Sequence, residues 1–280
     1  MDLLVSTDWL ADELGADDLV ILDATLFLPG TGRDAAEEYA QGHIPGAGFL
    51  DLPTLIDADD PRPGMVPPAI LFAERVGTLG VGDGSRVVLY DNSPLRSVAR
   101  AWWLFRLFGA RNIAILDGGM QKWLAEGRAL DRETPTRAER RFTPRKDEAM
   151  VRTKADLLAN IDSRAAQVLD ARGMPRFTGE EAEPRPGMAS GHIPDSLCLP
   201  YGQLFNPDNT WKSADDLRAL FKGAGIDLNE PVIVTCGSGV TAADLLVAAR
   251  LTGKTDVTLY DGSWGEWGAD PATPKATGPA

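Results

Sequence analysis

Short apolar runs alternate with helix-like segments along the chain, most clearly in its second half. Four apolar runs there have the length of buried strands: 168–170, 196–199, 232–235 and 257–260. Three segments between them have helical character: 153–160, 214–222 and 242–251. This alternation predicts an α/β fold with a mainly parallel sheet. In such folds ligands bind at the carboxyl ends of the strands.

Three short motifs of the first half recur, in the same order, in the second half. Gly-His-Ile-Pro at 42–45 returns at 191–194, Ile-Leu-Asp-Ala at 21–24 returns as Val-Leu-Asp-Ala at 168–171, and Leu-Asp-Gly-Gly at 116–119 returns as Tyr-Asp-Gly-Ser at 260–263. The period is far too long for a solenoid repeat. The chain is therefore predicted to contain two homologous domains.

The predicted organisation is a first domain over residues 1–135, a linker over 136–150 and a second domain over 151–280. The linker region is rich in charged residues and prolines, as is typical of segments between domains. The final stretch, 269–280, is rich in Pro, Ala and Gly and has no packing pattern. We expect this tail to be loose.

Composition narrows the possible partners and the compartment. The 28 lysines and arginines are outnumbered by 41 aspartates and glutamates, which gives a net charge of −13, so no nucleic-acid partner is expected. No stretch is long and apolar enough to cross a membrane, and the acidic N-terminal segment lacks the pattern of a leader peptide. Two cysteines are too few for a disulfide framework, so a cytoplasmic location is expected. With only two histidines besides, no metal-binding spacing is recognisable, and no metal is expected.

The segment 232–243 carries the strongest chemical signal in the chain. A β-branched strand ends at Thr235, a loop with two glycines follows, and a helix is predicted from residue 242. The amides of this loop, led by those of the glycines and Ser238, are expected to form an anion-binding nest backed by the helix N-terminus. Such a nest stabilises a thiolate at Cys236, and the thiolate is the reactive form. The alternative is a buried free cysteine that acts as a small apolar residue.

The other cysteine and the first half of the chain lack this arrangement. Cys198 lies between two leucines in a predicted strand and is expected to be inert and packed. Alignment of the two halves places Asp91 at the position of Cys236, and the nearby Pro94 has no N–H to contribute to an amide nest. The first domain is therefore predicted to be non-catalytic.

The two homologous halves, the aspartate in place of the first cysteine, the two Gly-His-Ile-Pro motifs and the cysteine loop together resemble the 3-mercaptopyruvate sulfurtransferases, a family with tandem rhodanese-type domains. The resemblance runs from about residue 5 to residue 268. It implies two homologous rhodanese-like domains, each a mainly parallel five-stranded sheet flanked by helices. It also implies that the catalytic residues form one loop: Cys236, Gly237, Ser238, Gly239, Val240 and Thr241.

The resemblance implies a transferase that moves sulfur from 3-mercaptopyruvate to a thiophilic acceptor through a persulfide on Cys236 and releases pyruvate. No metal or organic cofactor is implied, and the acceptor is expected to be cyanide or a thioredoxin-type dithiol. In the family, two loop arginines bind the substrate carboxylate and carbonyl, and Arg176 and Arg185 match them in this chain. Guanidinium groups suit a planar 2-oxo acid.

One feature departs from the family pattern. Several members have an Asp and a His that are proposed to form a relay with the serine of the catalytic loop, whereas Pro53 and Gly64 stand at those places here. His43 and His192 belong to the repeated motif and are expected to be structural turn residues. Catalysis is therefore expected to proceed without a histidine base.

Other functions remain as alternatives. Thiosulfate sulfurtransferases are related, but they typically have Arg and Lys after the cysteine, where this chain has Gly237 and Ser238. A non-enzymatic sulfur-carrier or regulatory module needs less than a complete two-domain chain. A cysteine phosphatase or arsenate reductase needs an arginine six places after the cysteine, and Ala242 occupies that place. The sequence leaves open the physiological acceptor, the extent of thiosulfate activity and the oligomeric state.

Overall fold

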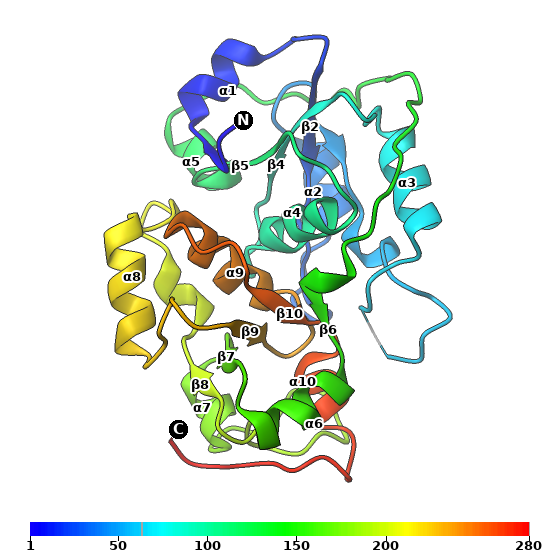
Figure 1. Cartoon of the computed structure of the whole chain (residues 1–280). Helices are drawn as coiled ribbons and strands as arrows, with labels where there is room; N and C mark the ends of the chain where they lie inside the picture. Colours follow the sequence, from blue (N-terminus) through cyan, green and yellow to red (C-terminus); the bar gives the residue numbers. More distant parts are fainter. Residues whose placement is uncertain (63, 280) are drawn as a thin grey trace. The chain divides into compact units, whose positions relative to one another are not determined.

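The computed structural model describes residues 1–62 and 64–279, and the chain divides into two compact units (Figure 1). The first unit comprises Met1–Ala58, Val66–Asp147 and Asn206–Trp211, and the second comprises Asp59–Met65, Glu148–Phe205 and Lys212–Ala280. Each unit contains one five-stranded sheet, so the predicted duplicated α/β fold is confirmed. The domain limits at 135 and 151 stay a prediction. In the structure, Asp59–Met65 of the first half belongs to the second unit, and Asn206–Trp211 of the second half belongs to the first unit.

The first sheet has the strand order β1, β5, β4, β2, β3, and every neighbouring pair is parallel. Its strands are β1 (Leu4–Val5), β2 (Leu19–Asp23), β3 (Gly48–Phe49), β4 (Arg86–Tyr90) and β5 (Ile113–Leu116). The helical elements of this unit are α1 (Thr7–Glu13), α2 (Ala35–Gln41), η1 (Leu52–Thr54), α3 (Ala69–Thr78), α4 (Val98–Leu107) and α5 (Gly119–Ala125). Parallel neighbours require crossover connections, and these helices provide them.

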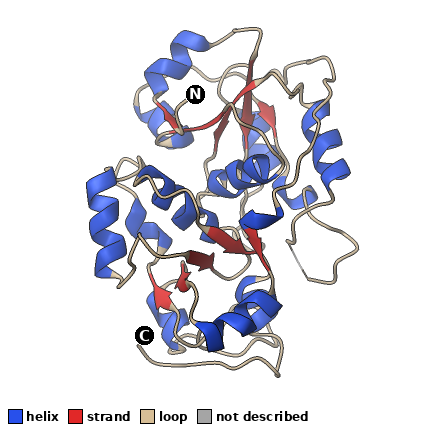
Figure 2. Ribbon diagram, viewed as in Figure 1, coloured by secondary structure: helices blue, strands red, loops and turns tan. Residues whose placement is uncertain are grey.

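The second sheet repeats this order as β6, β10, β9, β7, β8, again with parallel pairs. Its strands are β6 (Val151–Arg152), β7 (Gln167–Asp170), β8 (Leu197–Cys198), β9 (Val232–Thr235) and β10 (Thr258–Tyr260). Its helical elements are η2 (Glu148–Met150), α6 (Lys154–Ser163), α7 (Met174–Thr178), η3 (Tyr201–Leu204), α8 (Ala214–Gly223), α9 (Ala242–Leu251) and α10 (Ser263–Trp267). Figure 2 shows the red strands of each sheet with blue helices around them.

All the elements predicted for the second half are present. Strand β9 and helix α9 begin and end where the sequence predicts, and the other predicted elements differ by a few residues at their ends. The sequence did not reveal β6, α7 or α10. A two-residue strand and five-residue helices are too short to show a hydrophobic period.

Two packed layers hold the second sheet and orient the end of β9. On one face, Ile233 of β9 and Tyr260 of β10 share a core with Leu157 of α6 and the two tryptophans of α10. Helix α9 packs against β9 and β10, and its residues 242–249 are all buried. This segment is apolar except for Asp244, as expected of a helix in the interior. The N-terminus of α9 is therefore fixed beside the carboxyl end of β9.

Equivalent strands in the two sheets pair in the same register. Residues 21–23 of β2 pair with 88–90 of β4, and residues 168–170 of β7 pair with 233–235 of β9. The residue after β4 thus corresponds to the residue after β9. This correspondence confirms the alignment that puts Asp91 in place of the cysteine.

The two motif histidines have structural roles, as predicted. His43 and His192 are buried, at 0% and 3% exposure. Their rings stack on Tyr39 and Phe177, with centroid distances of 4.0 Å and 3.9 Å. Each Nδ1 lies within hydrogen-bonding distance of the carbonyl of the residue on which its ring stacks. Both imidazoles are thus held inside their units.

The C-terminal stretch is packed, so the expectation of a loose tail is wrong for its described part, 269–279. His192 and Ala276 form an antiparallel bridge with reciprocal backbone hydrogen bonds. Trp267 Nε1 donates to the carbonyl of Pro274 at 2.8 Å, and Thr273 is buried. The backbone pairing of Ala276 and the hydrogen bond from Trp267 hold this segment in place, although its composition gives no sign of packing.

Asp91 should make the stability of the protein depend on pH. Burial, with a contribution from the charge of Asp23, raises the pKa of Asp91 to about 7, so the folded state favours the neutral carboxyl. The stabilisation from this group is complete below its ordinary pKa near 4 and is lost as pH rises to about 7. The loss is on the order of 4 kcal/mol. Chemical denaturation of wild type and Asp91→Asn from pH 4.5 to 8 should show the variant gaining relative stability until about pH 7. A difference independent of pH would contradict this account.

Candidate active site

Cys236 is the first residue after β9, and two backbone amides are directed at its sulfur. The N–H of Gly239 donates to Sγ at 3.1 Å and the N–H of Ser238 donates at 3.4 Å. Cys236 is only 2% exposed. Gly239 has φ +76°, a left-handed conformation that glycine adopts without strain and that turns the loop back around the sulfur. The predicted amide nest is therefore present around a thiol.

Helix α10 fixes the backbone of this loop from the other side. The N–H of Trp264 donates to the carbonyl of Cys236 at 2.8 Å, and the N–H of Gly265 donates to that of Gly237 at 2.9 Å. The hydroxyl of Ser263 accepts from the N–H of Cys236 at 3.2 Å and donates to a β10 carbonyl at 2.9 Å. Ser263 is fully buried and has φ +49°, a strained value for a residue other than glycine.

Sequence reasoning used the segment that contains Ser263 only as evidence of duplication. Its counterpart in the first unit is Gly119, which has φ +57° and no hydroxyl. Comparison of the repeats could have found this difference, because a serine replaces a glycine at a matched turn only in the half that has the cysteine.

The rest of the predicted loop leads into α9, with Thr241 as the N-cap residue. The carbonyls of Val240 and Thr241 accept from the N–H groups of Ala243 and Asp244, both at 3.2 Å. Residues 238–240 thus lie at the N-terminal end of a ten-residue helix. The positive partial charge at that end favours an anion at the sulfur position.

The two predicted substrate-binding arginines both lie beside this loop. A Cβ atom built on Gly237 would be 3.2 Å from Nη2 of Arg176, and one built on Gly265 would be 3.4 Å from Nη1 of Arg185. The guanidinium of Arg176 therefore lies close to the loop backbone at Gly237, and that of Arg185 lies close to the backbone of α10 at Gly265. Arg176 is on α7, and the side chain of this arginine is 26% exposed.

Sequence reasoning missed the role of the residues that hold Arg176. The carboxylate of Glu183, whose side chain is 1% exposed, forms ion pairs with both Arg172 and Arg176. Arg172 in turn pairs with Asp170, at 2.8 Å from Nη2 to Oδ2, and stacks over the ring of Trp264. Burial alone lowers the pKa of Arg172, but the two carboxylates outweigh it and hold this pKa above its ordinary value.

Gly64 lies against the loop at the place where the family resemblance implied a histidine. A Cβ atom on Gly64 would be 3.9 Å from the carbonyl oxygen of Ser238. A side chain at position 64 would therefore reach the loop, whereas glycine supplies no base there. The other relay position, Pro53, lies in η1.

A charged group from the same segment contacts α10. Nη1 of Arg62 lies 2.7 Å from Oε1 of Glu266, and the hydroxyl of Tyr260 donates to Oε2 at 2.9 Å. Hydrogen bonding with Asp60 and the charge of Glu266 raise the pKa of Arg62 above its usual range, although burial opposes this. These contacts join residues 60–62 to the helix that fixes the cysteine loop.

Comparison with known proteins agrees with this geometry. The model of the rhodanese-like domain matches the chain twice, over residues 6–126 and 153–270. The chain belongs to the rhodanese-like family. It is therefore a tandem member, and each match covers four of the five strands of one sheet.

Full-length relatives of this rhodanese-like protein are sulfurtransferases. The chain is 42% identical over 270 residues to 3-mercaptopyruvate sulfurtransferase of Homo sapiens, covering 94% of this chain and 91% of that one. It is 40% identical over 272 residues to thiosulfate sulfurtransferase of Bos taurus, with the same coverage. The crystal structure of the 3-mercaptopyruvate sulfotransferase SseA from Escherichia coli superposes with a TM-score of 0.86 at 37% identity, covering 94% of this chain and 99% of that one. The rhodanese-like protein is accordingly a sulfur-group transferase.

Cys198 differs from Cys236 in its hydrogen bonding. It lies in β8, and its thiol donates to the carbonyl of Arg172 at 3.4 Å. Burial, with the nearby charge of Asp170, raises the pKa of Cys198 to about 12. A thiol with such a pKa is protonated at neutral pH and is a poor nucleophile.

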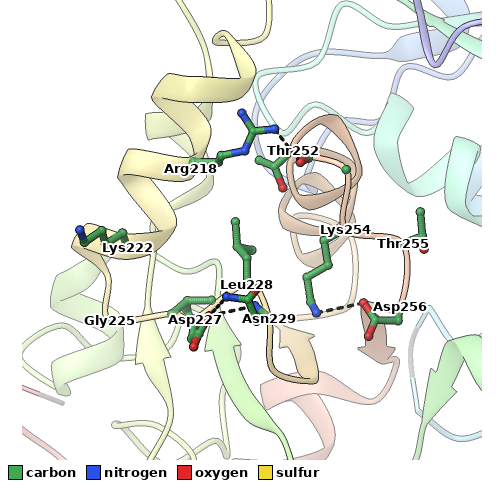
Figure 3. Close-up of a pocket in the computed structure, with 12 residues that line it drawn as sticks. Arg218, Lys222, Gly225, Asp227, Leu228, Asn229, Thr252, Lys254, Thr255 and Asp256 are labelled. Carbon is green, nitrogen blue, oxygen red and sulfur yellow. Dashed lines mark hydrogen bonds and ion pairs between the residues drawn. The ribbon is translucent and has the colours of Figure 1, made fainter.

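A cavity of about 820 Å³ lies at the opposite end of the second sheet (Figure 3). Residues 225–229 and 252–256, which precede β9 and β10, line it together with two α8 side chains. Among its charged side chains, Lys254 and Asp256 form an ion pair at 2.9 Å. Because it is at the amino ends of the strands, it is not part of the cysteine site.

Within residues 1–62 and 64–279, no group of three His, Cys, Asp or Glu side chains is placed to hold a metal ion. None of the helices there is both long and apolar enough to span a membrane.

The contrast between the cysteines gives a direct test of the nucleophile. Cys236→Ser should abolish sulfur transfer, and Cys198→Ser should retain it nearly unchanged, because only Cys236 Sγ accepts from loop amides. Initial rates of the two variants and wild type, with circular dichroism to verify folding, measure this. A folded Cys198→Ser variant that has lost activity would overturn the assignment.

Proposed function

We propose that this protein is a 3-mercaptopyruvate sulfurtransferase that carries sulfur as a persulfide on Cys236. The main support is the identity of the residues that surround the Cys236 sulfur. Neutral Gly237 and Ser238 follow the cysteine, and the guanidinium of Arg176 lies against Gly237. A monoanionic 2-oxo acid can then be held by arginines while its sulfur faces Cys236. The sulfurtransferase relatives support the same assignment.

In the first half-reaction, Arg176 and Arg185 bind the carboxylate and carbonyl of 3-mercaptopyruvate. The Cys236 thiolate attacks the substrate sulfur and a new S–S bond forms. The C–S bond breaks and its electron pair passes to the carbon chain, which leaves as the enolate of pyruvate. The enolate takes up a proton to give pyruvate, and Cys236 keeps the outer sulfur as a persulfide.

The loop supplies electrostatic stabilisation in this step. The amides of Ser238 and Gly239 donate to Cys236 Sγ in the resting protein, so the thiolate is solvated by fixed dipoles before substrate binds. The Ser238 hydroxyl is proposed to hydrogen-bond the substrate carbonyl or to pass on the proton that the enolate requires. No histidine is needed in this scheme.

In the second half-reaction a thiophilic nucleophile attacks the outer sulfur and releases the Cys236 thiolate. Cyanide or a thioredoxin-type dithiol is the proposed acceptor. The cycle requires a reduced thiol, and both cysteines are free. A cytoplasmic location is part of the proposal for this reason.

Thiosulfate sulfurtransferase is the second candidate, because relatives with that name are similar at almost the same identity. Thiosulfate is a dianion, and the cationic residues expected beside the cysteine of such enzymes are Gly237 and Ser238 here. Loss of one or two charged contacts favours 3-mercaptopyruvate by roughly tenfold to several hundredfold in kcat/KM. Measurement of kcat/KM with both donors tests the proposal, and a wild-type preference for thiosulfate would refute it.

Substitution in the loop should shift this donor preference. Ser238→Lys adds a cation next to the cysteine and should raise kcat/KM for thiosulfate relative to 3-mercaptopyruvate. Gly237→Ala is the matched steric control, because its Cβ would crowd Arg176 at 3.2 Å without adding charge. It should lower activity with 3-mercaptopyruvate and leave thiosulfate activity no better. An equal response of both donors to Ser238→Lys would contradict the charge argument.

Loss of an arginine should weaken the 2-oxo acid site. Arg185→Gln is the cleaner variant, because Arg185 is exposed and no salt bridge to it is found among the described residues. Loss of a charge-assisted contact should lower kcat/KM for 3-mercaptopyruvate by on the order of 1.5 to 3 kcal/mol. Steady-state kinetics measure this effect, and unchanged kinetics in both Arg185→Gln and Arg176→Gln would mean that the carboxylate binds elsewhere.

A further inference from the structure

Four charged side chains form a row that ends at the cysteine loop. Asp170 pairs with Arg172, Arg172 pairs with Glu183 at 2.6 Å between Nη1 and Oε1, and the other oxygen of Glu183 pairs with Arg176. The side chains of the first three are 1% exposed, and that of Arg176 is 26% exposed. The row thus runs from the interior to the guanidinium that lies against Gly237.

Glu183 is not needed to neutralise Arg172. Asp170 already accepts from Nε and Nη2 of Arg172, at 2.9 Å and 2.8 Å, and the carbonyl of Gly191 accepts from Nη2 as well. The carboxylate of Glu183 is instead divided between two guanidinium groups. Burial of a third charge next to a satisfied pair is costly, so its position calls for a role beyond stability.

The row itself carries no net charge. Two carboxylates cancel two guanidinium groups, which leaves the charge of Arg185 unopposed beside the loop. Arg62, which contacts α10 at Glu266, is paired with both Asp60 and Glu266 and therefore adds no positive charge. Loss of the negative charge of Glu183 would leave the row with a net positive charge beside Gly237, which favours a dianion such as thiosulfate over the single carboxylate of a 2-oxo acid.

We propose that Glu183 is a specificity-determining positioning residue, which aims Arg176 at the loop and lowers the charge of the donor site so that monoanions are preferred over dianions. It acts through Arg176 and does not touch the substrate. This inference rests on the proposed function in assigning the donor site to the arginines. It adds a reason why a site with two arginines prefers the less charged donor.

The test compares Glu183→Gln with Glu181→Gln. Each variant removes one negative charge from the same loop, but Glu181 is exposed and Glu183 is buried between arginines. In Glu183→Gln the ratio of kcat/KM for 3-mercaptopyruvate to that for thiosulfate should fall about tenfold, the effect of one unit of charge at a partly buried site. Glu181→Gln should stay within about twofold of wild type. Equal ratios in folded Glu183→Gln and wild type, or equal changes in the two variants, would overturn the proposal.

Glu183→Asp separates position from charge and serves if Glu183→Gln does not fold. It keeps the negative charge but is one methylene shorter, so it cannot contact both arginines as Glu183 does. The KM for 3-mercaptopyruvate should rise severalfold while kcat changes less, because Arg176, which would then be misplaced, binds the substrate and takes no part in bond breaking. A wild-type KM in folded Glu183→Asp would show that Glu183 does not aim Arg176.

Binding of unreactive anions distinguishes failure of this inference from failure of the proposed function. Pyruvate is a monoanion and sulfate a dianion, and their binding to the resting protein is measured by calorimetry without turnover. Glu183→Gln should tighten sulfate relative to pyruvate about tenfold, whichever donor the wild type prefers. An unchanged relative affinity would reject the role of Glu183 even if 3-mercaptopyruvate proves to be the donor.

Discussion

The hydrogen bonds from two loop amides to Cys236 Sγ are the interaction on which the chemistry of this protein depends. Cys236 is 2% exposed, so its sulfur has little contact with water, and fixed dipoles must replace that water if a thiolate forms there. The amides of Ser238 and Gly239 and the N-terminus of α9 supply those dipoles. Helix α10 then holds the loop backbone through Trp264, Gly265 and the Ser263 hydroxyl. Because these donors belong to the backbone of packed elements, they require little rearrangement when charge develops.

The first unit shows what the same backbone does without these side chains. The N–H of Met120 donates to the carbonyl of Asp91 at 3.0 Å, in the place where Trp264 donates to Cys236 at 2.8 Å. The frame of strand end and following helix is thus retained. The side chain at its centre is a buried carboxyl with a pKa raised to about 7, which suits a neutral structural group. Duplication therefore preserved the fold in both halves, and only the second half retains the residues that make an anion site at the strand end.

The fold was largely predictable because strands and helices of ordinary length leave periodic patterns and the repeat doubles the information. The cysteine loop was predictable for a local reason, since glycine, strand end and helix start are adjacent in sequence. The partners that complete the site were not predictable in this way. Glu183, Ser263 and Arg62 reach the loop region only through tertiary contacts, and α7 and α10 are too short to show a helical period. The tail was misjudged because backbone pairing of Ala276 with His192 leaves no mark in its composition.

The most direct test of the central claim is the mass of the intact protein after one equivalent of 3-mercaptopyruvate, measured together with the pyruvate released. Proteolytic fragments then locate the added sulfur. The account predicts a gain of one sulfur atom on the fragment that contains Cys236, one pyruvate per sulfur, and loss of that sulfur when cyanide is added. Pyruvate release without sulfur on Cys236, or sulfur found on Cys198, would contradict the account.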